Sequence, residues 1–161
     1  MVKQQKKDPH VSVEMVIASP IDQAFNYIVP VELSHIFKRY KFLPAVVKTN
    51  ETEQWIRPGL SRTVFFDDGS TSKETLLTVV PYTSFSYEIF DFTSQLRFLA
   101  KKIEGNFQFI DLGNARVQVT WTYKIVPMNS LTKLFIRCFL VKAVRGLMYN
   151  ALSTLKNDLE S

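Results

Sequence analysis

The chain has 161 residues, of which 46% are hydrophobic and 22% charged, a length and composition that suit one soluble domain with a single core. A net charge of +5 does not by itself imply nucleic-acid binding, and without a DNA- or RNA-recognition motif we expect no nucleic-acid partner. The single cysteine, Cys138, cannot form an intrachain disulfide. Neither a signal peptide nor an uninterrupted apolar run of membrane-spanning length is found, so we expect a cytoplasmic location.

The first third of the chain predicts one strand and two short helices. Residues 1–10 are expected to form a flexible polar leader, and residues 11–16 alternate as in a strand. Ser19 is a suitable N-cap for a helix that begins at Pro20 and ends near residue 30. A second short helix is expected at residues 31–37.

The middle of the chain predicts six further strands separated by turns. The expected strands are residues 46–55, 60–67, 72–80, 84–92, 97–110 and 116–126. In the last of these, Val117, Val119, Trp121, Tyr123 and Ile125 alternate with polar residues. One apolar and one polar face are typical of an antiparallel sheet that is covered on one side.

The final segment predicts one long helix capped by Asn129 or Ser130. At about 100° per residue, an apolar stripe forms with Arg145 in its middle and Tyr149 on its flank. The stripe consists of Leu134, Cys138, Val141, Met148, Leu152 and Leu155. Arg145 either extends to solvent or pairs with a carboxylate of the sheet, or else it anchors an anionic or carbonyl group of a ligand.

Together these elements predict an α+β protein of order β-α-α-β6-α. A curved antiparallel sheet of about seven strands wraps around the long C-terminal helix, with space for a small apolar molecule between them. The 13 phenylalanines could also fill much of that space.

Short sequence fragments support this arrangement in their order and spacing. They are Ser19-Pro20, His35-Ile36-Phe37, Leu43-Pro44, Trp55, Pro58-Gly59, Arg62-Thr63-Val64, Asp68-Gly69-Ser70, Glu74, Phe85-Ser86-Tyr87, Phe92-Thr93, Gly105 and Val119-Thr120-Trp121-Thr122-Tyr123. With these, the chain from Val11 onward resembles the SRPBCC superfamily, the START-like or helix-grip fold, and its polyketide cyclase/dehydrase-like proteins.

The resemblance implies a single START-like domain over residues 11–161 that needs no cofactor. Members of this superfamily include lipid and hormone carriers, aromatase/cyclases, ring-hydroxylating oxygenase subunits and chaperone activators, so the fold does not specify an activity. The only histidines, His10 and His35, have no further ligands at metal-binding spacing, so we expect no metal site.

The candidate site depends on one hairpin. If Asp67-Asp68-Gly69 is a three-residue loop with Gly69 left-handed, Arg62 lies opposite Glu74 on one face of the sheet. That face either lines the cavity or is exposed to water. If it faces inward, Arg62, Glu74 and Arg145 form a polar cluster that can orient the polar end of a ligand. The candidate ligand-binding residues are Arg62, Glu74, Tyr87, Phe107, Trp121, Tyr123, Arg145 and Tyr149.

Three functions are compatible with the sequence. The first is binding of a hydrophobic small molecule, such as a lipid, isoprenoid or polyketide-like compound, in the cavity between the sheet and the C-terminal helix. The second is a cyclase or dehydratase that uses the same pocket. No nucleophile, phosphate-loop or dinucleotide motif is present, so its acid or base would be Glu74, Asp91 or Tyr87.

The third function is contact with a membrane surface, or with a partner such as a second copy of the chain. The apolar residues Ile136, Phe139, Leu140 and Leu147 lie off the centre of the helical stripe, near Arg137 and Lys142. Apolar residues beside cations suit a transient membrane contact or a homodimer interface.

Overall fold

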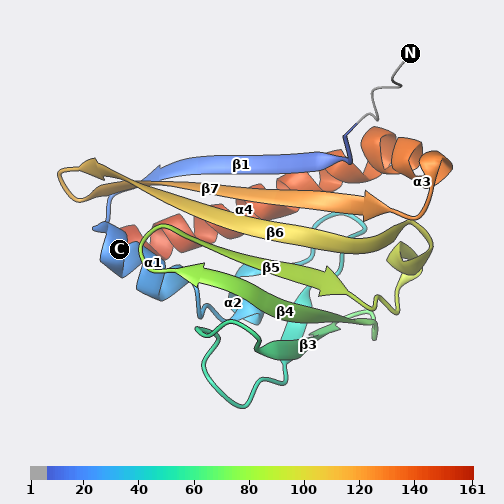
Figure 1. Ribbon diagram of the computed structural model, residues 1–161, viewed down its shortest axis with the longest axis horizontal. Coiled ribbons are helices and arrows are strands. Elements are labelled where there is room, and N and C mark those ends of the chain that lie inside the picture. Colours follow the sequence, from blue (N-terminus) through green and yellow to red (C-terminus); the bar gives the residue numbers. More distant parts are fainter. Residues whose placement is uncertain (1–6) are drawn as a thin grey trace.

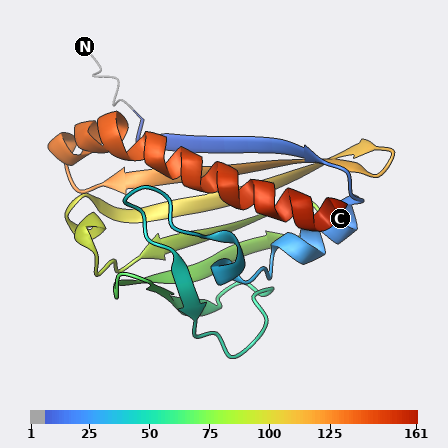
Figure 2. The same cartoon turned by 180° about the vertical axis from the view of Figure 1, so that it is seen from behind.

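Seven strands form one antiparallel sheet in the order β1-β7-β6-β5-β4-β3-β2. The structure, a computed structural model, describes residues 7–161. The strands are β1 (His10–Ile17), β2 (Val46–Thr49), β3 (Ser61–Phe66), β4 (Thr71–Val80), β5 (Ser84–Phe90), β6 (Ala100–Gly113) and β7 (Arg116–Pro127). The sheet is curved, and the long C-terminal helix crosses its inner face (Figures 1 and 2). The predicted α+β helix-grip fold is therefore confirmed.

Strand β7 carries the alternation that the sequence predicts. The odd-numbered residues from Val117 to Ile125 are buried, and the even-numbered residues between them are only partly buried. Strands β1 and β6 pair with β7 on its two sides. Around β7 the inner face of the sheet is thus apolar, and its outer face is polar.

Two short helices follow β1 and lie against the inner face of the sheet, α1 (Ile21–Ile28) and α2 (Leu33–Ile36). Pro20 precedes the first helical residue, but the predicted N-cap bond of Ser19 is not formed. The Ser19 hydroxyl instead donates to the Pro20 carbonyl at 3.2 Å. The apolar side of α1, with Phe25 and Ile28, packs into the core.

The C-terminal helix consists of three consecutive segments. They are α3 (Ser130–Phe135), the π-helical segment η2 (Ile136–Leu140) and α4 (Val141–Glu160). Asn129 caps the helix as predicted, in a reciprocal capping box with Thr132.

The predicted buried stripe of this helix is only partly correct. Met148, Leu152 and Leu155 are fully buried as expected, but Leu134 and Cys138 are exposed. The reason is η2, because a π-helix places one more residue in each turn than an α-helix does. The residues before η2 are therefore rotated about the helix axis, relative to where about 100° per residue would place them. Ile136 and Leu140 are buried in place of the two exposed residues.

Arg145 is also exposed, so its predicted place in the middle of the buried stripe is wrong. Val144 and Ala151, which the prediction left out, face the core together with Met148. Their side chains move the centre of the buried face away from Arg145. Tyr149, next to Arg145 on the helix surface, is exposed as well.

Several element boundaries differ from the prediction. Strand β2 ends at Thr49 rather than at residue 55, since the Asn50 side chain accepts a hydrogen bond from the Thr63 amide at 2.6 Å and ends the ladder. Residues 50–60 form a loop. A short 3₁₀-helix, η1 (Gln95–Phe98), precedes β6 where the prediction had strand.

The chain is already ordered before Val11. Pro9 is buried and its carbonyl accepts a hydrogen bond from the Ile125 amide at 2.9 Å, so pairing with β7 begins ahead of the predicted boundary. The first six positions of the predicted leader lie outside the described residues. Within residues 7–161, none of the helices combines the length and the apolarity that crossing a bilayer requires.

Candidate ligand pocket

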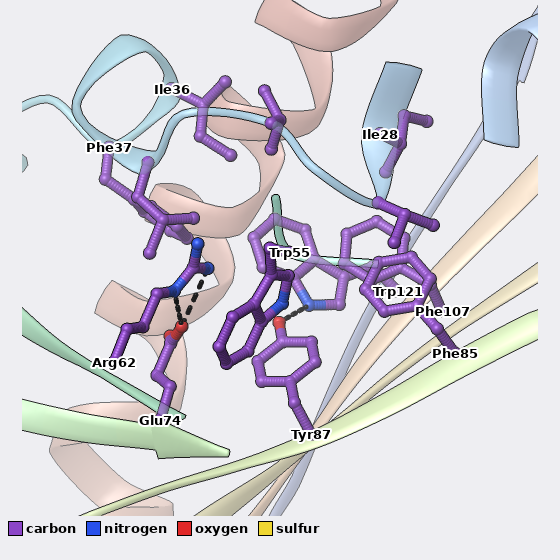
Figure 3. A pocket seen from close by; sticks show the side chains of 13 residues that line it. Ile28, Ile36, Phe37, Trp55, Arg62, Glu74, Phe85, Tyr87, Phe107 and Trp121 are labelled. Atoms are coloured by element: carbon purple, nitrogen blue, oxygen red, sulfur yellow. Dashed lines mark hydrogen bonds and ion pairs between the residues drawn. The ribbon is translucent and has the colours of Figure 1, made fainter. Parts of the chain in front are cut away.

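A pocket lies between the inner face of the sheet and the segment that carries α1, α2 and the 50–60 loop (Figure 3). Its lining residues are Ile28, Val29, Val31, Leu33, Ile36, Phe37, Trp55, Arg62, Glu74, Phe85, Tyr87, Phe107 and Trp121. No residue of α4 lines it, so the prediction of a cavity between the sheet and the C-terminal helix is wrong in this respect. Helix α4 packs directly on the sheet through fully buried side chains such as Met148 and Leu152.

The volume of this pocket is about 30 Å³, whereas a cavity needs roughly 10–15 Å³ to hold one water molecule. Pockets that hold small-molecule ligands usually measure roughly 300–1,000 Å³. The aromatic side chains that fill the space are closely packed: the ring centroids of Phe85 and Phe107 are 4.7 Å apart, as are those of Phe107 and Trp121. The pocket as it stands is therefore too small for a ligand of that size.

A buried ion pair forms the polar end of the pocket. Arg62 and Glu74 are direct partners in the β3–β4 register, as predicted, and Gly69 in the connecting turn has φ +82°. Both side chains face inward and are nearly inaccessible to solvent. The Arg62 Nε and Nη2 atoms each lie 2.9 Å from Glu74 Oε2 (Figure 3).

Two residues of the 50–60 loop bind the same guanidinium group. Glu51 Oε1 accepts from Arg62 Nη1 at 3.0 Å, and the Trp55 ring centroid lies 4.0 Å from Arg62 Cζ. The Trp55 side chain is buried although it comes from a loop, and it points into the pocket (Figure 3). The loop is thus fastened over the pocket by a charged hydrogen bond and a cation–π contact. No sequence pattern pointed to Glu51, because only the tertiary fold brings it to Arg62.

A second polar network lies beside this ion pair. Trp121 Nε1 donates to the Tyr87 hydroxyl at 3.0 Å, and Tyr87 donates to the Tyr123 hydroxyl at 3.3 Å. Gly105 makes room for the Tyr87 ring, since a β-carbon at that position would lie 2.4 Å from Tyr87 Cζ. Burial raises the pKa of both tyrosine hydroxyls, so both stay protonated as hydrogen-bond donors.

The two carboxylates around Arg62 differ in acidity. Burial raises the pKa of Glu74 above its ordinary value, although Arg62 acts in the opposite direction. At Glu51, burial is outweighed by hydrogen bonds from Thr49 and the backbone and by Arg62, so its pKa is lowered. Arg62 is thus a cation shared by two carboxylates. Of these two, Glu74 is the one that takes up a proton more readily.

The raised pKa of Glu74 predicts that the free energy of unfolding depends on pH. A raised folded-state pKa at Glu74 stabilises the fold fully below the ordinary value of 4.5, and that contribution is lost as the pH rises through the folded-state pKa. The Glu74→Gln variant has no ionisable side chain at this position. We expect the free energy of unfolding of the natural chain, relative to this variant, to fall as the pH rises from about 4.5. Urea unfolding of both proteins across that range measures it, and a rise would show that Arg62 outweighs burial.

Most predicted site residues meet in one place. Arg62, Glu74, Tyr87, Phe107 and Trp121 line the pocket, and Tyr123 borders it through its bond to Tyr87. The remaining two, Arg145 and Tyr149, lie on the solvent side of α4. Asp91, the other carboxylate considered, is exposed and pairs with Lys73 at 2.9 Å. Among residues 7–161, no three His, Cys, Asp or Glu side chains are grouped as metal ligands.

A curved antiparallel sheet, a long C-terminal helix and an aromatic pocket on the inner face of the sheet define a START-like, helix-grip protein. The chain belongs to the family described as polyketide cyclase / dehydrase and lipid transport, which matches residues 8–160. The resemblance stated from the sequence is thereby confirmed. None of the curated proteins matches this chain.

Solved structures with the same fold come from distant relatives. The Zhui aromatase/cyclase from Streptomyces sp. R1128 superposes with a TM-score of 0.69 at 16% identity, over 94% of this chain and 93% of that one. Ginseng major latex-like protein 151 from Panax ginseng has a TM-score of 0.69 at 12% identity, with 96% and 99% covered. A START superfamily protein from Mycobacterium smegmatis has 0.68 at 10% identity, with 94% and 97% covered. At these identities the likeness shows a shared fold.

Proposed function

We propose that the protein binds a hydrophobic small molecule with a polar end, such as a lipid, isoprenoid or polyketide-like compound, in the pocket under α2 and the 50–60 loop. The observation that carries this proposal is the ion pair of Arg62 and Glu74, buried among aromatic side chains. A buried ion pair contributes little net stability, because desolvation of two charges offsets their attraction. Apolar walls with a few fixed polar groups are typical of sites that orient a ligand.

Binding requires the 50–60 loop to move, because the closed pocket holds about 30 Å³. Withdrawal of Trp55 frees the space of its ring, and withdrawal of Glu51 frees Arg62 Nη1. The Glu51 side chain is already 25% exposed, so it can exchange Arg62 for water. A carbonyl or carboxylate oxygen of the ligand then takes the place of Glu51 Oε1 as the hydrogen-bond acceptor of Arg62 Nη1. The family description, which joins polyketide cyclases with lipid transport, supports a ligand of this class.

Removal of the Trp55 ring is expected to strengthen binding. A desolvated cation–π contact contributes about 1–2 kcal/mol to the closed state, so Trp55→Ala should bind about tenfold more tightly. The two tryptophans of the chain, Trp55 and Trp121, both line the pocket, so indole signals report on this site alone. Titration with palmitate, farnesol and an anthraquinone, followed by the Trp121 indole N–H resonance, measures the effect.

The matched control is Ile56→Ala, which removes an exposed apolar side chain from the same loop and should leave the affinity unchanged. Native mass spectrometry of the purified chain adds an independent readout, since a co-purified apolar adduct identifies the ligand class. If none of the three compounds moves the Trp121 signal in either protein and no adduct is found, the proposal is wrong.

A cyclase or dehydratase is the second candidate function, and one observation favours it. The raised pKa of Glu74 in a closed apolar pocket is a property of general acids. Glu74→Gln separates the two functions: a carrier whose ligand binds Arg62 and does not use the Glu74 charge keeps nearly all of its affinity, whereas an enzyme that uses Glu74 as its acid or base loses turnover of a polyketide-like substrate. Turnover by the variant would exclude Glu74 as the catalytic acid or base.

A further inference from the structure

Helix α3 exposes an apolar surface at one end of the molecule. None of its side chains is buried, and Leu131 and Leu134 are 77% and 60% exposed. Phe139 of η2 is 63% exposed, and its ring lies 5.0 Å from that of Phe135. We call these four residues, Leu131, Leu134, Phe135 and Phe139, the end patch. Exposed apolar side chains that gather in one place usually mark a contact surface.

The end patch lies opposite the side of the helix that faces the core. Ile136 and Leu140 point inward, while the end-patch residues recur at three- and four-residue spacing on the other side. The π-helical segment produces this division, because it rotates α3 relative to α4. In both views α3 projects past the end of the sheet, beside the turn that carries η1 (Figures 1 and 2). A hydrogen bond of 2.9 Å from the Met128 amide to the Leu99 carbonyl joins the two segments, and Phe98 and Met128 are exposed there too.

The segment of the chain that contains the end patch has only basic residues among its charged ones. Residues 112–157 contain no aspartate or glutamate. The outer face of the helix continues from the end patch through Lys142 and Arg145, which are exposed. Arg137, between Leu134 and Phe139 in the chain, is exposed too, and its Nη2 donates to the Lys7 carbonyl. From the neighbouring elements, Arg97 is exposed on η1, and Asp8 is the acidic group nearby, paired with Lys133 at 3.5 Å.

We propose that the end patch docks the protein on a bilayer surface that contains anionic lipids. Phenylalanine and leucine side chains enter the interface between headgroups and acyl chains, while Arg137, Lys142 and Arg145 bind lipid phosphates and carboxylates. A symmetric dimer through the same surface would bring the cations of two copies together, so the charge favours the membrane over a second copy. This role is independent of the ligand in the pocket, and it places exposed Arg145 and Tyr149 at the membrane interface.

The test is co-sedimentation of the full chain with vesicles of phosphatidylcholine alone or with about 30% phosphatidylserine. We expect binding to the mixed vesicles at low salt and loss of most of it at high salt. Leu134→Ser/Phe139→Ser should weaken binding about tenfold or more. Lys142→Ala should weaken it about fivefold.

Matched controls lie at the opposite end of the molecule, in the β6–β7 hairpin. Ile110→Ser removes an apolar side chain that is 52% exposed, and Arg116→Ala removes an exposed cation. Both should bind like the natural chain. All of these positions are exposed, so thermal unfolding of each variant should be unchanged. The proposal is overturned if the natural chain does not bind the mixed vesicles, if the end-patch variants bind equally well, or if sedimentation shows a dimer that Leu134→Ser/Phe139→Ser dissociates.

Discussion

Replacement of Arg62 by methionine is expected to lower the free energy of unfolding by about 3–5 kcal/mol. The change leaves the Glu74 carboxylate buried without its partner, and it releases Glu51 and Trp55 from the guanidinium group. Urea unfolding at neutral pH measures the loss. Because the unpaired Glu74 is more easily protonated, the deficit should shrink as the pH falls.

A double variant distinguishes loss of charge pairing from loss of packing. Arg62→Met/Glu74→Met replaces both charges with apolar side chains, and its stability should return to within about 1 kcal/mol of the natural chain or exceed it. Arg57→Met is the matched single control, since Arg57 forms an exposed pair with Glu53 and should cost less than about 0.5 kcal/mol. Equal effects at Arg57 and Arg62 would contradict a buried ion pair. Recovery in the double variant would also provide a folded protein in which the polar end of the ligand site is absent.

Gly105→Ala is expected to destabilise the protein by up to about 3 kcal/mol. The added β-carbon would lie 2.4–2.9 Å from three atoms of the Tyr87 ring. That ring cannot move aside freely, because it packs on Phe85 at a centroid distance of 6.0 Å and its hydroxyl binds Trp121 and Tyr123. Chemical denaturation measures the cost, and a change in tryptophan emission should accompany it as the bond to Trp121 is strained.

The specific cause is tested by removing the ring. In a Tyr87→Leu background, Gly105→Ala should cost less than about 1 kcal/mol, which gives a coupling energy of roughly 2 kcal/mol. Gly113→Ala is the control: no atom lies within 4 Å of its added β-carbon, but its φ of +75° is unfavourable for alanine. Its cost should be the same with and without Tyr87. An unchanged cost for Gly105→Ala in the Tyr87→Leu background would show that the clash with Tyr87 is not the cause.

Local sequence patterns predicted the order of elements and the pairing of the candidate residues. The alternation of β7 specified which of its residues face the core, since successive side chains of a strand point to opposite faces. The Asp67-Asp68-Gly69 turn specified the register that places Arg62 against Glu74, because a left-handed glycine determines how the two strands meet. Both features depend on neighbouring residues or on one hairpin.

The parts that could not be predicted depend on contacts between distant segments. Whether the Arg62–Glu74 pair faces inward is decided by the curvature of the whole sheet and by the loop that brings Glu51 and Trp55 over it. The π-helical segment η2 decides which side of the C-terminal helix is buried. A helical pattern that assumes about 100° per residue throughout does not detect such a segment. The sequence by itself thus determined the helix-grip fold and five of the thirteen residues that line the pocket. Only the tertiary structure decided that Trp55 packs on Arg62 in the pocket, that the pocket lies away from α4, and that Arg145 faces solvent. These outcomes depend on packing between elements far apart in the chain.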